Sequence, residues 1–404
     1  MFRSFRLMAA VAAVAILSAC GGGGGSSDLA PPVVVDGKLE KPATLNLYPN
    51  VSATTGTRLT VMVTSVGSVP VSMPLIFDTG SAGVTLYAPS IFPAGMVNAA
   101  GFVFPAGQTS ISYNGITVTD QQGTRTYGSN VLHTQSGNIG YAQLTFGDAQ
   151  GKITTEVMPV FLYYSAQNIA TGAPIEPVPG NQGIFGVAST FGTIVVPGSV
   201  EPAIGYPACA LETSGTCLVA SAFKFLQYGT GVNAGFMLTP APIQTCDITT
   251  AGSCRPAPML TVGLTPALES GFSTLSLVCP PAGYLGPATI NGYPPCQKTV
   301  EDATLAVSGP QVGSITGGVV FDTGTSVMQI APAPGASFPA TVAAGSTVMV
   351  TTPSGFTYTY DSSTSGPSST SVITDSTNVS IVGIGYFTTN SYFVDFSASI
   401  TGWK

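Results

Sequence analysis

The chain has few charged residues and a single histidine. Lys and Arg number 11 and Asp and Glu number 18 among 404 residues, so the formal net charge is −7. Binding to nucleic-acid phosphates requires clustered cations, and this composition therefore predicts no nucleic-acid partner. With one histidine and no Cys-x-x-Cys pair, the sequence also lacks the usual ligands of a metal site. We expect neither a metal nor another cofactor.

The scarcity of histidine also disfavours a Ser-His-Asp hydrolase. Such an enzyme would have to use His133, and no Gly-x-Ser-x-Gly segment is present to supply the nucleophilic serine. We therefore interpret His133 as a solvent-exposed loop residue.

Long apolar runs are absent except near the N-terminus. Residues 7–19 are apolar, follow Arg3 and Arg6, and are too short to span a bilayer as a mature helix. Residues 1–19 are therefore predicted to be an export signal.

The end of this signal resembles a bacterial lipoprotein box, Leu17-Ser18-Ala19-Cys20. The resemblance implies that Cys20 is lipidated and anchors the protein to a membrane, and Gly21 after it implies sorting to the outer membrane. A Gly/Ser-rich tether over residues 20–45 would then hold the folded part away from the lipid. An ordinary signal peptide with a chance cysteine is the alternative.

Glycine and proline are abundant, at 49 and 32 residues, and they leave no long helical periodicity. Short alternating apolar segments between turn residues predict an all-β protein. One helix is expected over residues 219–228, where Val219, Phe223 and Leu226 share a face. The length favours two lobes, which we assign to residues 46–230 and 231–404.

Six further cysteines in an exported chain predict a disulfide framework. Spacing alone does not determine their connectivity, and sequential pairing is our working hypothesis. The pairs would be Cys209/Cys217, Cys246/Cys254 and Cys279/Cys296.

The most informative feature is a tripeptide, Asp-Thr-Gly, that occurs twice. It begins at Asp78 and at Asp322, each time directly after an apolar segment that reads as a strand. The duplication predicts two halves that each bring one carboxylate to a shared cleft. Paired carboxylates that share one proton suit peptide hydrolysis by an activated water. For either Asp alone, a turn residue is the alternative interpretation.

Each tripeptide is followed later by an apolar-apolar-Gly segment, Ile184-Phe185-Gly186 in the first half and Ile381-Val382-Gly383 in the second. With these four segments, the chain resembles a bacterial relative of the pepsin-like aspartic peptidases. The resemblance implies a bilobal all-β fold with a cleft between two β-barrel-like lobes. It also implies that Asp78 and Asp322 are catalytic and that the later segments brace their loops.

The resemblance further implies roles for the neighbours of each Asp. Thr79 and Thr323 would exchange hydrogen bonds across the lobes. Gly80 and Gly324 would each bring a backbone N–H close to the carboxylate. Ser81 and Thr325 would each donate a hydroxyl to the neighbouring Asp. Tyr127 would cover the cleft from a hairpin flap, although Asn130 stands where the family usually has a second glycine.

The sequence thus predicts a monomeric aspartic endopeptidase that acts on peptide or protein substrates and is held outside the cytoplasm, at the outer membrane, by a lipid. Two other classes stay open. The chain could be a pepsin-like binding protein without activity, or a surface lipoprotein of β-sandwich type. In the β-sandwich, the two Asp-Thr-Gly loops would lie apart; in a pepsin-like protein, they would meet.

Overall fold

The computed structural model describes residues 33–35, 37–52, 56–128, 132–177, 180–196, 210–212, 215–250, 252–281, 287–373 and 378–404. Within these ranges the secondary structure is almost entirely β-strand, and the predicted all-β class is confirmed. The helical elements are single turns: 3-10 helices at Ala88–Ser90, Ala222–Phe225 and Tyr386–Thr388, and α1 (Pro266–Glu269). None of the described helices is long and apolar enough to cross a bilayer. Residues 1–32, with Cys20, lie outside the described part.

The first Asp-Thr-Gly follows a strand in the middle of a large sheet. This strand, β5 (Val69–Asp78), pairs antiparallel with β4 (Gly56–Val66) and parallel with β15 (Gly183–Val187). The other strands of this region are β1 (Val33–Val35), β6 (Ala82–Tyr87), β9 (Ser110–Tyr113), β10 (Ile116–Tyr127), β11 (His133–Ala142), β12 (Leu144–Asp148), β13 (Gly151–Thr154), β14 (Met158–Asn168), β16 (Gly192–Val195), β17 (Ala210–Glu212) and β18 (Thr216–Val219).

The second Asp-Thr-Gly follows β25 (Gly313–Phe321), in a separate sheet of seven strands. Here β25 pairs antiparallel with β24 (Val300–Ser308) and parallel with β30 (Val379–Val382). The sheet is completed by β26 (Met328–Ile330), β27 (Thr347–Thr351), β28 (Thr357–Asp361) and β29 (Thr370–Val372). Each Asp loop therefore has a parallel strand beside it, supplied by the predicted apolar-apolar-Gly segment.

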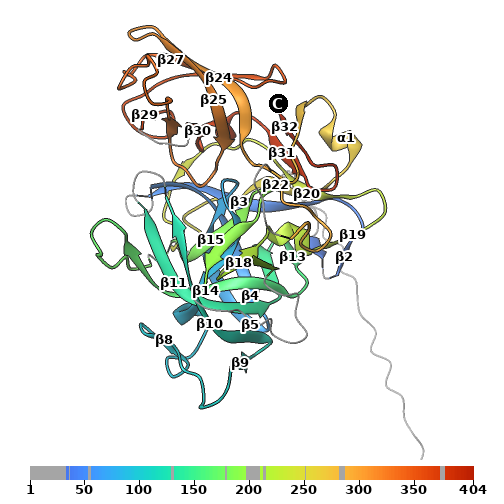
Figure 1. Cartoon of the computed structure of the whole chain (residues 1–404). Coiled ribbons are helices and arrows are strands. Elements are labelled where there is room, and N and C mark those ends of the chain that lie inside the picture. Colours follow the sequence, from blue (N-terminus) through green and yellow to red (C-terminus); the bar gives the residue numbers. More distant parts are fainter. Residues whose placement is uncertain are drawn as a thin grey trace, which may run out of the picture. The chain divides into compact units, whose positions relative to one another are not determined.

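Strands from both ends of the chain lie between these two regions (Figure 1). The long strand β3 (Ala43–Ser52) pairs with β22 (Ala257–Leu264) through its first half and with β4 through its second half. The layer continues through β20 (Asn233–Leu238), β31 (Tyr392–Asp395), β32 (Ile400–Trp403), β23 (Ser273–Ser276) and the short β21 (Gln244–Thr245). Two small ribbons complete the fold, β2 (Lys38–Leu39) with β19 (Gln227–Tyr228) and β7 (Val97–Asn98) with β8 (Gly101–Phe102).

Aromatic residues pack beneath both Asp loops. Phe77, directly before Asp78, is fully buried against Phe185, Phe223 and Phe236. Such contacts between aromatic rings add to the free energy gained by burying their apolar surface. They fix the end of β5, and with it the position of the first loop.

The residue before the second Asp is also surrounded by aromatic rings. Phe321 is buried and its ring contacts Tyr386, Tyr392 and Trp403. The C-terminal strand that carries Trp403 therefore supports the second loop from below.

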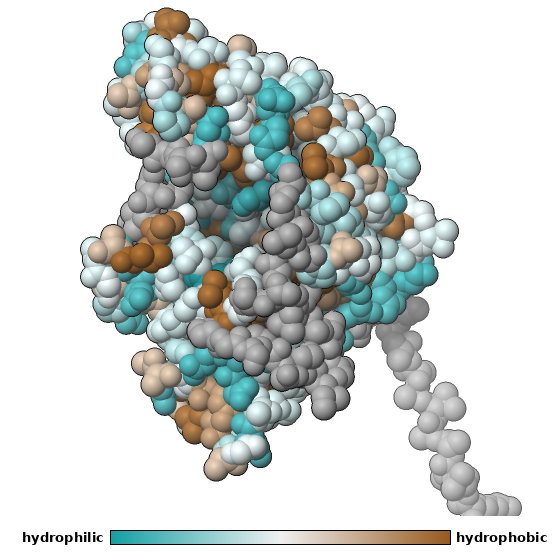
Figure 2. Space-filling model, viewed as in Figure 1, coloured by the Kyte–Doolittle hydropathy of each residue, from teal (hydrophilic) through white to brown (hydrophobic). Residues whose placement is uncertain are grey.

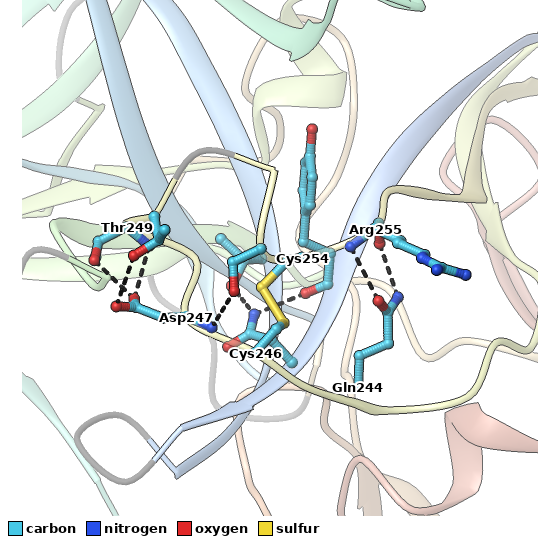
Figure 3. Close-up of a disulfide and its surroundings, with 11 residues drawn as sticks. Gln244, Cys246, Asp247, Thr249, Cys254 and Arg255 are labelled. Carbon is cyan, nitrogen blue, oxygen red and sulfur yellow. Dashed lines mark hydrogen bonds between the residues drawn. A yellow bond between two sulfur atoms is a disulfide. The ribbon is translucent and has the colours of Figure 1, made fainter.

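Two of the three sequential disulfide pairs are present, Cys246 with Cys254 and Cys279 with Cys296. Figure 3 shows the first of them closing a turn that is further held by the side chains of Gln244 and Asp247. Structural disulfides persist in oxidising compartments and indicate an extracytoplasmic protein. Cys209 lies outside the described residues, so its pairing with Cys217 stays a prediction.

The predicted helix over residues 219–228 is wrong. The segment begins in β18, continues as the one-turn 3-10 helix Ala222–Phe225 and ends in β19. Of the apolar residues with helical spacing, Phe223 packs against Phe77 and Leu226 lies in the same core. Val219 packs in a second cluster of buried residues instead. Tertiary packing has overridden the local pattern here.

Candidate functional site

The first carboxylate is held by its own loop. Asp78 stands at the end of β5, and its Oδ1 accepts hydrogen bonds from the backbone N–H groups of Gly80 at 2.7 Å and Ser81 at 3.1 Å. The Ser81 hydroxyl donates to the other oxygen, Oδ2, at 2.5 Å. Three donors thus converge on a side chain that is 7% exposed. Hydrogen bonds of this kind favour the ionised form of a carboxylate.

The second carboxylate is held in nearly the same way. Oδ1 of Asp322 accepts from the backbone N–H of Gly324 at 2.7 Å, and Oδ2 accepts from the hydroxyl of Thr325 at 2.7 Å. The backbone N–H of Asp322 donates to the carbonyl of Val382 in the parallel strand β30. The equivalent parallel strand in the first half, β15, places Gly186 opposite Asp78.

The threonines join the two loops. Thr79 Oγ1 donates to the carbonyl of Phe321 at 2.7 Å and accepts from the backbone N–H of Thr323 at 3.0 Å. In return, Thr323 Oγ1 donates to the carbonyl of Phe77 at 2.6 Å and accepts from the N–H of Thr79 at 3.1 Å. Both threonines are buried, so these four bonds are shielded from water and fix the spacing of the two halves.

The two loops approach so closely that only glycine fits after each threonine. A Cβ atom on Gly80 would lie 2.6 Å from Oδ1 of Asp322, and one on Gly324 would lie 2.8 Å from Cγ of Asp78. The glycine of each loop therefore lies in close contact with the carboxylate of the other loop. The β-sandwich alternative, which keeps the two Asp-Thr-Gly loops apart, is excluded.

The electrostatics of the pair favour one shared proton. Burial, together with the charge of Asp78 and a hydrogen bond to it, raises the pKa of Asp322 well above the ordinary value for an aspartate. The Thr325 hydroxyl and the charge of Lys298 lower this pKa, but their effect is smaller. Two neighbouring carboxyls of this kind titrate jointly, with one proton retained between them.

The pair opens into a cavity of about 870 Å³. Figure 2 shows a hollow on this side of the molecule, between the part that holds the seven-stranded sheet and the first-half sheet, with hydrophilic residues inside it. The β10–β11 hairpin borders the cavity with Arg125, Tyr127 and His133. The candidate flap residue Tyr127 thus lies at this site, while Asn130 lies outside the described residues.

His133 differs from its interpretation as an exposed loop residue. It is half-buried at the beginning of β11, opposite Tyr127, and it lines the cavity. Its position results from the pairing of β10 with β11, which the sequence around it did not indicate.

Three cations of the cavity were not anticipated from the sequence. Lys298 Nζ donates to the carbonyl of Gly80, and Arg58 Nη1 donates to the hydroxyl of Ser326. Arg125 Nη2 donates to the carbonyl of Ala82. None of the cations lies in an Asp-Thr-Gly motif, and only the folded chain brings them to it. Their scarcity, with 11 Lys and Arg in all, is the one signal that could have drawn attention to them.

Two solved structures are similar to this chain. The aspartic proteinase from Irpex lacteus superimposes with a TM-score of 0.51 over 90% of this chain and 97% of that chain, at 16% sequence identity. Basic 7S globulin from soybean gives a TM-score of 0.47 over 91% and 96%, at 12% identity. No protein-family model and no curated protein matches the chain. At this identity, the likeness to the Irpex lacteus protein establishes the bilobal pepsin-like fold and no more.

Proposed function

We propose that this protein is an aspartic endopeptidase in which Asp78 and Asp322 activate a water molecule. The observation that carries the proposal is the meeting of two carboxylates, the buried Asp78 and the half-buried Asp322, each held by its own loop, at the floor of an open cavity. A site used only for binding has no need for two carboxylates in mutual repulsion. That repulsion is useful where one proton must be held and passed on.

The arrangement assigns the two acids different parts in the reaction. Asp78 receives three hydrogen bonds and acts as the ionised base that takes a proton from water. Asp322, with its raised pKa, holds the shared proton and gives it to the carbonyl oxygen of the scissile peptide. The water oxygen bonds to the carbonyl carbon. The proton taken by Asp78 then passes to the leaving nitrogen, the C–N bond breaks, and one hydroxyl of the tetrahedral intermediate returns its proton to Asp322. The products are a carboxylic acid and an amine.

The test is peptide cleavage by the soluble part of the chain that begins after Ser27, with Asp78→Asn and Asp322→Asn as variants. Each substitution preserves the shape of the side chain and removes one acid, so we expect cleavage to fall by at least about a thousandfold. Circular dichroism and melting curves serve as controls for folding. Full activity in either variant would contradict the proposal.

The same variants distinguish an enzyme from a pepsin-like protein that only binds. If the wild type binds peptides without cleaving them, and Asp78→Asn binds them equally well, the cleft is a binding site and the enzymatic proposal is wrong. A statine-type transition-state mimic sharpens this result. It should inhibit the enzyme through its hydroxyl, which occupies the place of the water between the acids.

We also propose that the protein acts as a monomer held at the outer membrane by a lipid on Cys20. The lipoprotein-like segment before Cys20 supports this, as do the disulfides, which suit an extracytoplasmic compartment. Cys20→Ala should abolish labelling by a radioactive fatty acid and remove the protein from the detergent-soluble membrane fraction. Unchanged membrane association of Cys20→Ala would show that something other than this lipid holds the protein.

A further inference from the structure

Cations are concentrated in the cavity of an otherwise acidic chain. Three of the 11 Lys and Arg residues line it, namely Arg58, Arg125 and Lys298. The carboxylates that line it are Asp78 and Asp322, which share one proton, and the exposed Glu176. Three positive charges thus face two negative ones, while the whole chain carries −7. A cavity with excess charge of one sign concentrates ligands of the opposite sign.

These cations are not neutralised by direct ion pairs. The partners of their hydrogen bonds are neutral: the carbonyls of Gly80, Thr57 and Ala82, and the hydroxyl of Ser326. Within the described ranges the salt bridge found joins Lys38 to Glu40, two exposed residues. The charges of Arg58 and Lys298 also act on the Asp pair, whereas Arg125 has no carboxylate among its hydrogen-bond partners in the described ranges.

Arg125 differs from the other two cations by its burial. Its side chain is 5% exposed, and its guanidinium carbon lies 4.8 Å from the centre of the Tyr127 ring. Nη2 bonds the carbonyl of Ala82, whereas Nη1 is buried and has no hydrogen-bond partner. A buried donor without a partner destabilises the protein, and a donor on a charged group does so more strongly. Tying the hairpin to β6 would account for the stacking and the Ala82 bond, but it leaves Nη1 unexplained.

A carboxylate is the group that would satisfy this guanidinium. Arginine presents parallel N–H donors that match the two oxygens of a carboxylate, and such charge-assisted bonds are stronger than neutral ones. Ala82, to which Arg125 is bonded, directly follows Ser81, the hydroxyl donor of Asp78. A carboxylate bound to Arg125 would therefore belong to a residue close to the scissile bond.

We propose that the substrate carries a glutamate or aspartate beside the scissile peptide bond and that Arg125 binds its carboxylate. Arg58 and Lys298 contribute by attracting the acidic segment into the cavity. This inference rests on the proposed peptidase function, of which it specifies the substrate class.

The first experiment compares matched peptides that differ by Glu against Gln, or Asp against Asn, at each position around the cleaved bond. At about pH 5.5 a peptide glutamate is ionised, since its ordinary pKa is about 4.3. A charge-assisted hydrogen bond corresponds to at least about a tenfold advantage in kcat/KM, which we expect for Glu at one position. Salt should reduce this advantage, because it screens the attraction. Equal kcat/KM for both members of every pair would overturn the inference while leaving the peptidase intact.

The second experiment assigns the preference to Arg125. In Arg125→Gln the ratio of kcat/KM for Glu to Gln peptides should fall to about one. A purely structural role would instead lower kcat/KM for both peptides together and leave the ratio unchanged, which would refute the assignment. Arg255→Gln is the matched control: Arg255 is exposed, is not among the residues lining the cavity, and extends away from the disulfide in Figure 3. This control should keep the wild-type ratio.

Two further measurements apply if the Arg125→Gln variant does not fold or if no peptide is cleaved. If Arg125→Gln does not fold, Arg125→Lys serves instead: it keeps the charge but loses the paired donors, so the ratio should fall several-fold, and an unchanged ratio would count against the proposal. If no peptide is cleaved at all, the peptidase proposal fails by itself. Calorimetric binding of the Glu and Gln peptides then still tests the preference, and equal affinities would overturn it.

Discussion

The two Asp-Thr-Gly loops are nearly identical in their internal bonding but differ in what surrounds them. In both, a glycine N–H and a hydroxyl bind the carboxylate, and a buried threonine reaches into the other half. In the first loop the backbone N–H of Ser81 adds a third donor to Asp78. The second loop has no equivalent bond to Asp322 among the described residues. The two carboxylates are therefore held by unequal sets of hydrogen-bond donors.

The cations near the loops are exchanged between the halves. Lys298, shortly before β24 of the seven-stranded sheet, bonds the first loop at Gly80, while Arg58, in β4 of the first half, bonds Ser326 beside the second loop. Each loop is thus held by a threonine and a cation from the opposite half. Neither loop is complete within its own half, so the geometry of the pair depends on how the two halves join.

Among substitutions that leave both acids in place, the largest effect is expected from breaking the threonine exchange. Thr79→Val and Thr323→Val preserve the volume of the side chain but leave a buried N–H and a buried carbonyl in the other half unpaired. Each should lower the free energy of unfolding by about 2–4 kcal/mol and cleavage by about ten- to a hundredfold. Because the exchange is symmetric, the two variants should be affected equally in urea denaturation and in kcat.

A surface threonine pair provides the control for these variants. Thr126 and Thr134 face each other across the β10–β11 hairpin through exposed hydroxyls. Thr134→Val should change stability by well under 1 kcal/mol. A strongly unequal loss between Thr79→Val and Thr323→Val would show that the two loops are not equivalent even in this exchange.

An intermediate effect is expected from the hydroxyl donors, and here the two loops should behave differently. Removing a donor from an ionised carboxylate raises its pKa. Ser81→Ala, which removes the hydroxyl bonded to the proposed base, should therefore move the acidic limb of the rate profile to higher pH. Thr325→Val should move the alkaline limb, which reports the proton on Asp322, to higher pH. Loss of one charge-assisted bond corresponds to a shift of about one pH unit.

The measurement is kcat/KM for one peptide across pH in the wild type and both variants. If both substitutions move the same limb, the assignment of base and acid is wrong. If Ser81→Ala moves the alkaline limb and Thr325→Val the acidic one, the two roles are reversed.

The sequence alone indicated the residues of the site that are repeated in the two halves, but not those that occur in only one half. Asp78, Asp322 and their threonine neighbours belong to a short repeated motif whose bonds are local or copied between halves, so the pattern alone indicated them. Arg125 and Lys298 reach the site only through strand pairing and chain closure over long separations, and nothing in their local sequence marks them. The helix over residues 219–228 failed for the same reason, since contacts remote in sequence decided its conformation.

The smallest effect concerns stability against pH and again separates the two acids. The folded-state pKa of Asp322 is raised to about 7, above its value in the unfolded chain of about 3.9. Between these values the folded state binds more protons than the unfolded state, so the free energy of unfolding should decrease as pH rises through this window.

The substitution Asp322→Asn removes this pH dependence. The substitution Asp78→Asn only reduces it, because the repulsion is lost while the burial of Asp322 remains. The decrease in Tm between pH 4 and 7 should thus be largest in the wild type, smaller in Asp78→Asn and smallest in Asp322→Asn, with differences of up to about 5 °C. Asp120→Asn, at an exposed position of β10, should follow the wild type. A wild-type Tm that rises across this range, with no difference among the variants, would show that Asp322 does not hold the shared proton in the folded protein.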